Sequence, residues 1–233
     1  MAANAAPRRA VRQPLNRARV IATAVLFIDV HGLQELSMRA LGRQLGVEAM
    51  AVYRYVPSRE DLLDGVVDFV VDELYDDPEV QRLPERSWQE YLVRFAHGVR
   101  AMALRHPQVF PLVATRPPSA PWVRPPLRSL RWVDSLLTGL MSQGFSELDA
   151  VYAYRAFSSF LLGHLLLEVS ALGVDVGPVD EPESDTGQGD AVQHYPTLLQ
   201  LAPLLAEFHF EREFQDSLHN LIDRLGPGTG RDQ

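Results

Sequence analysis

The chain has 233 residues, of which 46% are hydrophobic and 22% are charged, and it contains no cysteine. These values are ordinary for a globular protein with one large domain or two modest ones. The absence of cysteine excludes disulfide frameworks and thiolate metal sites, and it is consistent with a reducing cytoplasm.

The charge is distributed unevenly along the chain. The net charge is −8, yet residues 1–60 carry nine arginines against four acidic residues, which leaves +5 there and −13 in the remainder. A basic end on an acidic body favours an anionic polymer as partner, although a merely basic tail gives the same count. No secretory signal is visible, and the most apolar stretch, 157–169, is too short to span a bilayer. We therefore expect a cytoplasmic protein with no membrane partner.

Residues 1–14 are expected to form a flexible basic arm. The apolar spacing that follows predicts a first helix over about 16–31. Asn16 is a suitable N-cap, and Gly32 is a suitable left-handed residue to end the helix.

Two short helices joined by a glycine turn come next. Ser37 can cap the first of them and Gly46 ends it, while the second covers 48–55 and stops at Pro57. Short helices in this arrangement, with a longer helix on each side, describe a helix-turn-helix inside a small bundle.

A fourth helix begins at Ser58, which can form a capping box with Asp61. Residues 76–87 then break the pattern and mark a domain boundary. Beyond it the chain shows helical periodicity and no trustworthy strand alternation, so we expect an all-α fold. The expected later elements are helices near 88–105, 108–114, 124–143, 146–171 and 197–224, a proline-rich connector at 116–126 and a mobile acidic loop near 173–196.

The second helix of a helix-turn-helix enters the DNA major groove. Ala49, Met50 and Ala51 are small or apolar enough to lie against thymine methyl groups. Tyr53 and Tyr55 can reach sideways to phosphate oxygens. Two readings stay open, because Tyr53 could instead pack in the core and Met50 could be a simple surface hydrophobe.

Basic and polar side chains surround this helix. Arg39 could reach a guanine edge or a phosphate, and Ser37 and Arg59 stand at helix N-termini, where free N–H groups favour an anion. Residues 15–76 are therefore expected to form a DNA-binding domain that includes the fourth helix.

Residues 15–63 resemble the DNA-binding domain of TetR-family transcriptional regulators. The most specific part is L-G-V, a four-residue gap and then V-Y-R-Y-V. The resemblance implies an all-helical homodimer that binds a palindromic operator and is released by a small effector. By position, the resemblance also implies which residues contact DNA. The base-reading residues are Arg39, Glu48, Ala49, Met50, Ala51 and Tyr53. The phosphate-binding residues are Met38, Tyr53 and Arg59.

The second half is similar to the tetracycline-repressor branch of that family, through "SWQEYLVRFAHGVRAM", "ATRP" and "GFSELDAVYAYRAFSSFLLGHLLLE". That branch has a metal-ligating histidine just before T-R-P, where this chain has Leu112 and Val113. We therefore expect neither a magnesium–tetracycline effector nor any metal or other cofactor.

Residues 77–233 are expected to bind the effector and to form the dimer. Aromatic side chains with a few polar groups could line an apolar pocket. The expected pocket residues are Phe95, His97, Val99, Met102, Thr115, Arg116, Trp132, Leu136, Phe157, Phe160 and His164. A stripe of small residues on the helix at 146–171, together with the apolar face of 197–224, could form a four-helix dimer core. A purely intramolecular core is the alternative.

The favoured hypothesis is a ligand-responsive, homodimeric repressor with no catalytic residues. One alternative is an enzyme that acts on a small aromatic molecule through His97 and His164. The chain lacks a phosphate loop, G-x-S-x-G and H-E-x-x-H, and both histidines are more readily explained as interior side chains. A second alternative is a DNA-binding protein without an effector.

Overall fold

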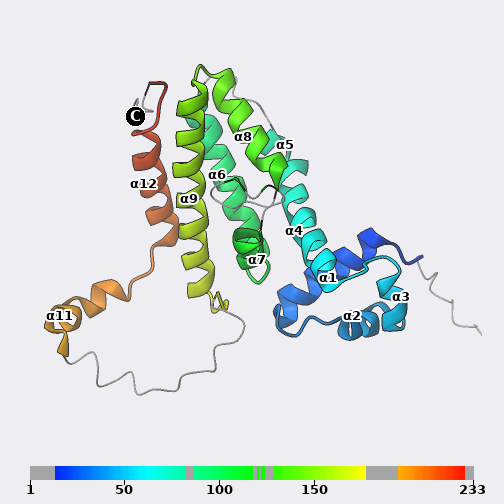
Figure 1. Ribbon diagram of the computed structural model, residues 1–233. Coiled ribbons are helices and arrows are strands. Elements are labelled where there is room, and N and C mark those ends of the chain that lie inside the picture. Colours follow the sequence, from blue (N-terminus) through cyan, green and yellow to red (C-terminus); the bar gives the residue numbers. More distant parts are fainter. Residues whose placement is uncertain are drawn as a thin grey trace, which may run out of the picture.

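The computed structural model describes residues 14–81, 87–117, 120, 122–123, 129–176 and 194–228. Most of the predicted basic arm, acidic loop and proline-rich connector lies outside these ranges. Within them every regular element is helical, which confirms the all-α prediction (Figure 1). The helices are α1 (Arg17–His31), α2 (Met38–Leu45), α3 (Ala49–Tyr53), α4 (Arg59–Asp76), α5 (Pro78–Gln81), α6 (Trp88–Arg105), α7 (Phe110–Thr115), α8 (Leu130–Ser142), α9 (Glu147–Ala171), α11 (Pro196–Leu205) and α12 (Phe210–Ile222).

The helix starts follow the predicted caps. The side chain of Asn16 accepts the N–H of Arg19, and that of Ser37 accepts the N–H of Ala40, at 2.8 and 3.1 Å. Each cap satisfies a backbone donor that the helix itself leaves unpaired. Gly46 ends α2 in the left-handed conformation, with φ 70°, which a glycine adopts without steric cost.

The start of α4 differs in one respect from the predicted capping box. The Ser58 hydroxyl accepts the N–H of Asp61 as expected, at 3.0 Å. The Asp61 carboxylate does not return to the cap; it accepts two hydrogen bonds from Arg17, at 2.7 and 3.2 Å. A charged donor is the stronger partner for a carboxylate than a backbone amide, so Asp61 ties α4 to the start of α1.

Helices α1 to α4 form the helix-turn-helix bundle. Its core holds buried side chains from all four helices, including Ile28, Leu41, Val52 and Val66. Val52 is the only buried residue of the five in α3. Because α3 is so short, its position depends on this one anchor and on the turn that joins it to α2.

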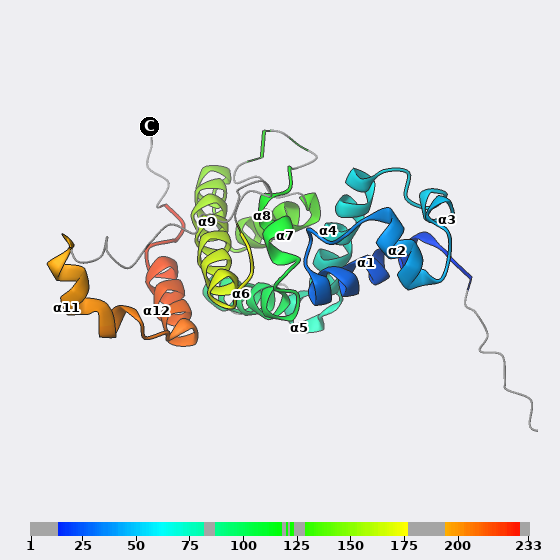
Figure 2. The ribbon, with the colours of Figure 1, turned by 90° about the horizontal axis from the view of Figure 1, so that it is seen from below.

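The second half of α4 leaves this bundle and packs against α5 and α6, so one continuous helix joins the two parts of the molecule (Figure 1). The body is built around α6, α8, α9 and α12, which lie side by side in Figure 2. Its largest fully buried side chains are Phe95, Trp132, Phe157 and Phe214.

Helix α9 has 25 residues and is long and apolar enough, by length and composition, to cross a membrane. The apolar stretch 157–169 is one part of this helix, so the length of that stretch alone does not decide whether the helix could span a membrane. Its place in the structure is that of a core helix, because it contacts α6, α7, α8 and α12. Side chains buried along its length include Phe157, Leu161 and Leu165.

The prediction of one helix over 197–224 was wrong. The chain forms α11 and α12 with a break at 206–209. Pro203 removes a backbone donor from α11, and Phe214, Leu218 and Ile222 fix α12 independently in the body. Residues 194–209 are all exposed, and α11 lies apart from the rest of the chain in Figures 1 and 2.

Candidate nucleic-acid interface and effector region

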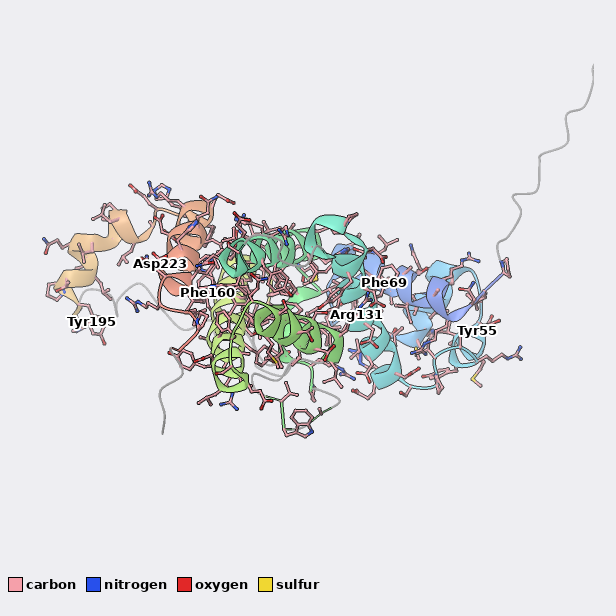
Figure 3. The ribbon with its side chains drawn as sticks, turned by 90° about the horizontal axis from the view of Figure 1, so that it is seen from above. Tyr55, Phe69, Arg131, Phe160, Tyr195 and Asp223 are labelled. Atoms are coloured by element: carbon pink, nitrogen blue, oxygen red, sulfur yellow. The ribbon has the colours of Figure 1, made fainter. Side chains whose placement is uncertain are left out.

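Helix α3 presents apolar and aromatic side chains to solvent at one end of the molecule. Met50 is 73% exposed, while Tyr53 and Tyr55 are 41% and 38% exposed. Figure 3 shows Tyr55 at the end of the molecule opposite Tyr195. Tyr53 therefore does not pack in the core, which removes one of the two alternatives given above. The other alternative, that Met50 is a simple surface hydrophobe, stays open.

The predicted phosphate-binding residues lie near the starts of α2 and α4. Arg39 and Arg59 are exposed, as is Glu48 before α3. Arg59 Nη1 lies 3.5 Å from the carbonyl oxygen of Leu36, which holds its guanidinium beside the start of α2. These positions allow both arginines to meet a phosphate backbone.

Met38 is placed differently from the other predicted contacts. Its side chain belongs to the hydrophobic core and is 8% exposed, because it faces inward in the first turn of α2. The thioether therefore cannot reach a phosphate, and only its backbone N–H at the helix N-terminus is available to an anion. The Ser37 hydroxyl accepts the N–H of Ala40 as the cap of α2 and keeps its own O–H as a donor.

Arg17 is a residue of this interface that the sequence did not single out. Besides Asp61, its guanidinium donates to the carbonyl oxygen of Tyr55 at 3.2 Å. Its pKa is raised mainly by the hydrogen bond with Asp61. Arg17 thereby fixes the segment that follows α3. Its partners Tyr55 and Asp61 lie 38 and 44 positions further along the chain.

The two helices of the helix-turn-helix approach each other closely at Gly42 in α2. A Cβ atom there would lie 2.9 Å from the carbonyl oxygen of Val47 and 3.2 Å from the backbone nitrogen of Ala49. The Gly42 carbonyl oxygen also accepts the N–H of Val47 at 2.9 Å. Backbone contacts at this glycine therefore set the position of α3 on α2.

The predicted effector residues are distributed over three places. Six of them belong to α6, α8 and α9 of the body, and all are buried: Phe95, Val99, Met102, Trp132, Leu136 and Phe157. The Phe95 ring is 5.1 Å from the Trp132 ring and 6.2 Å from the Phe157 ring, centroid to centroid. The Trp132 indole N–H has no hydrogen-bond partner within the described ranges.

Three others surround Phe214 of α12. The rings of His97, Phe160 and His164 have centroids 5.6, 5.9 and 5.3 Å from the Phe214 ring. Burial lowers the pKa of His164, which favours its neutral form. In the part of the chain that the structure describes, no group of three His, Asp or Glu side chains could hold a metal ion.

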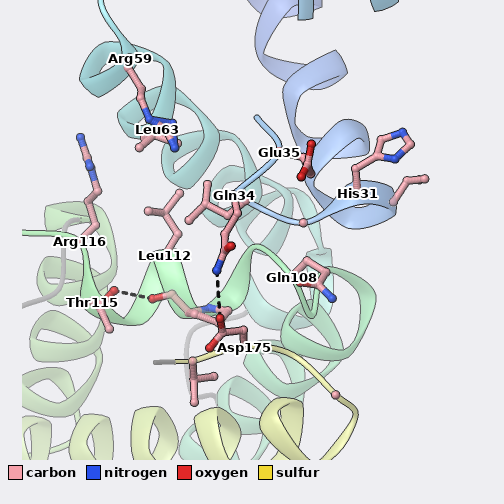
Figure 4. A pocket seen from close by; sticks show the side chains of 16 residues that line it. His31, Gln34, Glu35, Arg59, Leu63, Gln108, Leu112, Thr115, Arg116 and Asp175 are labelled. Atoms are coloured by element: carbon pink, nitrogen blue, oxygen red, sulfur yellow. Dashed lines mark hydrogen bonds between the residues drawn. The ribbon is translucent and has the colours of Figure 1, made fainter. Parts of the chain in front are cut away.

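Thr115 and Arg116 lie elsewhere, at the end of α7. Both line a cavity of about 690 Å³ between the end of α1, the start of α4, α7 and the segment after α9 (Figure 4). The side-chain amide of Gln34 donates to Asp175 across this cavity at 3.0 Å. Arg116 Nε donates to Asp64 at 2.7 Å, so the arginine joins the body to α4.

A smaller cavity of about 320 Å³ opens beside the buried cluster, between α4, α6 and α8. Phe95 forms part of its wall, with Tyr75, Tyr91 and Asp134. The Tyr91 hydroxyl donates to the carbonyl oxygen of Ser135 at 3.1 Å. Burial raises the pKa of Tyr75 to about 12, so both phenols stay neutral hydrogen-bonding groups. Phe95 is the one predicted effector residue that reaches this cavity.

An exposed helix-turn-helix bundle joined through one helix to an all-helical body with an aromatic core defines a DNA-binding regulator. Two family models match the chain. "Bacterial regulatory proteins, tetR family" matches residues 20–66, and "Tetracyclin repressor-like, C-terminal domain" matches residues 82–226. The chain therefore belongs to the TetR family of transcriptional regulators, with a tetracycline-repressor-like C-terminal domain, and this is not a family of enzymes.

Individual relatives agree with this assignment. An HTH-type transcriptional regulator of Saccharopolyspora erythraea is 29% identical over 157 residues, which is 66% of this chain and 61% of that protein. The chain thus spans less than two thirds of this relative's length. The crystal structure of a possible TetR family transcriptional regulator from Streptomyces coelicolor A3(2) superposes with a TM-score of 0.70, at 31% identity, over 89% of this chain and 97% of that one.

The Streptomyces coelicolor TetR family protein ActR, in complex with actinorhodin, superposes with a TM-score of 0.67 at 25% identity. The superposition covers 94% of this chain and all of that chain. The similarity extends over both the helix-turn-helix bundle and the body.

Proposed function

We propose that the protein is a cytoplasmic, homodimeric repressor that binds a palindromic operator and is released by a small hydrophobic effector. In this proposal residues 15–76 bind DNA and residues 77–233 bind the effector and the second subunit. The observation that carries it is the exposed tip of α3, where Met50 is 73% exposed on a helix anchored only by Val52. An apolar tip held away from the body suits contact with base methyl groups in the major groove.

The DNA-binding part is tested by a gel shift with the DNA that flanks the protein's own gene. We expect binding that weakens as salt rises, because phosphate contacts release counterions. The variant Met50→Glu should weaken binding at least about tenfold, since it replaces an apolar contact by a charge that DNA repels. Met141→Glu is the matched control, because Met141 is 47% exposed on α8, outside the bundle. Equal effects of the two variants would contradict a role for α3.

The dimer is supported by an apolar face of α9 that nothing in the described chain covers. Leu148, Tyr152 and Leu167 are 55%, 51% and 72% exposed, and they lie on the same side of the helix as Ser159 and Gly163. A Cβ atom at Gly163 would have no atom within 4 Å. Exposed apolar faces of this kind mark interaction sites, and small residues allow a second helix to approach closely. Phe214, Leu218 and Ile222 of α12 face their own subunit instead.

The oligomeric state is measured by sedimentation. We expect the wild-type chain to be a dimer and Leu167→Asp to shift it toward monomer, because a buried, unpaired carboxylate is costly. Leu26→Asp, on α1, is the control, since Leu26 is 65% exposed and lies outside the proposed interface. A wild-type monomer at all concentrations would refute the dimer.

We further propose that the effector enters by the cavity beside Phe95 and reaches the cluster of Phe95, Trp132 and Phe157. Two features support this. The cavity has an aromatic wall of Tyr75, Tyr91 and Phe95, and polar side chains of α8 that could orient a ligand. The buried Trp132 N–H has no partner in the described chain, so it can donate to a ligand. ActR, a relative in structure, is known in complex with actinorhodin.

This part is tested by thermal shift with actinorhodin as the probe. A ligand that binds the folded chain at 100 times its dissociation constant stabilises it by about 2.7 kcal/mol. Trp132→Phe removes the indole N–H and keeps an aromatic ring, so it should reduce the shift. If actinorhodin does not stabilise the chain while DNA still binds, an effector-independent DNA-binding protein is favoured.

A further inference from the structure

His106 lies where the helix-turn-helix bundle meets the body. It follows the last residue of α6, and its side chain is 10% exposed. Its Nδ1 is 2.7 Å from Asp29 Oδ2 on α1, and its Nε2 is 3.1 Å from Glu73 Oε2 on α4. One imidazole thus joins three helices, and Asp29 belongs to the bundle while α6 belongs to the body.

This geometry requires the protonated ring. An ionised carboxylate can only accept hydrogen bonds, and a neutral imidazole has one N–H to donate. Both contacts are satisfied together only by the imidazolium, in which both nitrogens donate. The C-terminus of α6 adds a favourable field for a positive charge. The hydrogen bonds with Asp29 and Glu73 raise the pKa of His106, against the opposing effect of burial.

The other charged groups around the ring act in both directions. Arg105 of α6 lies 3.7 Å from Glu73, and its positive charge opposes the imidazolium. Asp76 of α4 and Asp77 after it line a cavity of about 450 Å³ together with Glu73 and His106, and α7 has no titratable side chain. Asp29 Oδ1 is buried and accepts no hydrogen bond within the ranges described. If the ring lost its proton, one of its two carboxylates would face a lone pair.

We propose that His106, as an imidazolium, is a positioning residue that ties α1 to α4 and α6, and that its deprotonation releases the bundle from its orientation on the body. Other polar ties between bundle and body include Gln34 with Asp175, Arg116 with Asp64 and Glu60, and Arg131 with Asp72. Amides, arginines and ordinary carboxylates keep their charge from about pH 6 to about pH 9. Among these contacts of the described residues, His106 is a tie whose charge changes in this range.

The direction in which this stabilisation changes with pH follows from the direction of the pKa change. His106 has a folded-state pKa above its ordinary value of 6.5. The stabilisation is thus fully present below about pH 6.5 and is lost as the pH rises through the raised pKa. The expected effect on operator affinity rests on the proposed function. Two bundles in a fixed orientation bind an operator with less loss of freedom, so operator affinity should fall on the alkaline side.

The tie itself is tested without DNA, by hydrogen–deuterium exchange of the α1 amides at about pH 6 and about pH 9, corrected for the intrinsic rate. We expect the protection of wild-type α1 to fall about tenfold across this range. His106→Arg, which keeps the charge, should stay protected at both values. His106→Gln should be weakly protected at both. His219→Gln is the control and should follow the wild type, since His219 is exposed on α12 and its ring is hydrogen-bonded to Gln215 of the same helix.

Protection of wild-type α1 that does not change with pH would overturn the proposal, and so would a fall that His106→Gln still shows. Circular dichroism at about pH 6 identifies a variant that fails to fold, in which case the wild-type and His106→Arg profiles decide the matter. Operator affinity is then measured over the same range. A chain that binds no DNA at any pH would refute the proposed function and leave the exchange result standing.

Discussion

Replacing Gly42 by alanine tests whether backbone contact fixes α3 on α2. The new Cβ atom would lie 2.9 Å from the Val47 carbonyl oxygen, closer than ordinary contact. Alanine is favoured over glycine in a helix by about 1 kcal/mol, whereas overpacking a core costs about 1–3 kcal/mol. Because the obstacle is backbone and cannot rotate away, we expect a net loss of about 1 kcal/mol, which corresponds to about 2–4 °C in Tm for a chain of this size.

The expected effect on DNA binding is larger than the effect on stability. To bring this contact from 2.9 Å to the ordinary range of 3.4–4 Å, the start of α3 must move by about 0.5 Å or more. A recognition site tolerates about 0.5 Å. Operator affinity should therefore fall about tenfold, which is 1.4 kcal/mol. Tm is measured by circular dichroism and affinity by gel shift.

Gly65→Ala is the matched control in α4. There the nearest obstacle is Ile21 Cδ1, 2.6 Å from the new Cβ atom, and this methyl group can move by rotation of its side chain. We expect Gly65→Ala to keep operator affinity within about twofold. If Gly42→Ala binds the operator as tightly as Gly65→Ala, then the steric reasoning on α2 and α3 is refuted.

Three further substitutions have defined outcomes. Gly163→Ala should stabilise an isolated subunit by up to about 1 kcal/mol, because the site is open within the subunit, and it should weaken the dimer in sedimentation; tighter association would contradict close helix approach there. Ser37→Ala should cost about 1 kcal/mol through the lost cap of α2, measured as a lower Tm, and an unchanged Tm would show that water replaces the cap. Arg100→Met should cost about 3 kcal/mol, because Glu168, at 3% exposure, loses the guanidinium that binds it. Glu168→Gln in the same chain should restore much of that loss, and urea unfolding that shows no rescue would refute the pairing.

The sequence by itself determined the local structure and the family. Caps and turns act over three or four residues, so Asn16, Ser37, Ser58 and Gly46 could be assigned correctly without knowledge of the fold. Helical periodicity placed most helices within a few residues. The exposed α3 tip was predictable for the same reason, since it is part of a motif contained in a short stretch.

Only the tertiary structure decided the long-range contacts. His106 meets partners 77 and 33 residues away, and no local pattern specifies which carboxylates a distant helix will bring to it. Long-range packing also explains three other findings. These are the burial of Met38, the break between α11 and α12, and the division of the predicted effector residues among three places. Periodicity shows which face of a helix is apolar, whereas the packing of whole helices determines what that face meets.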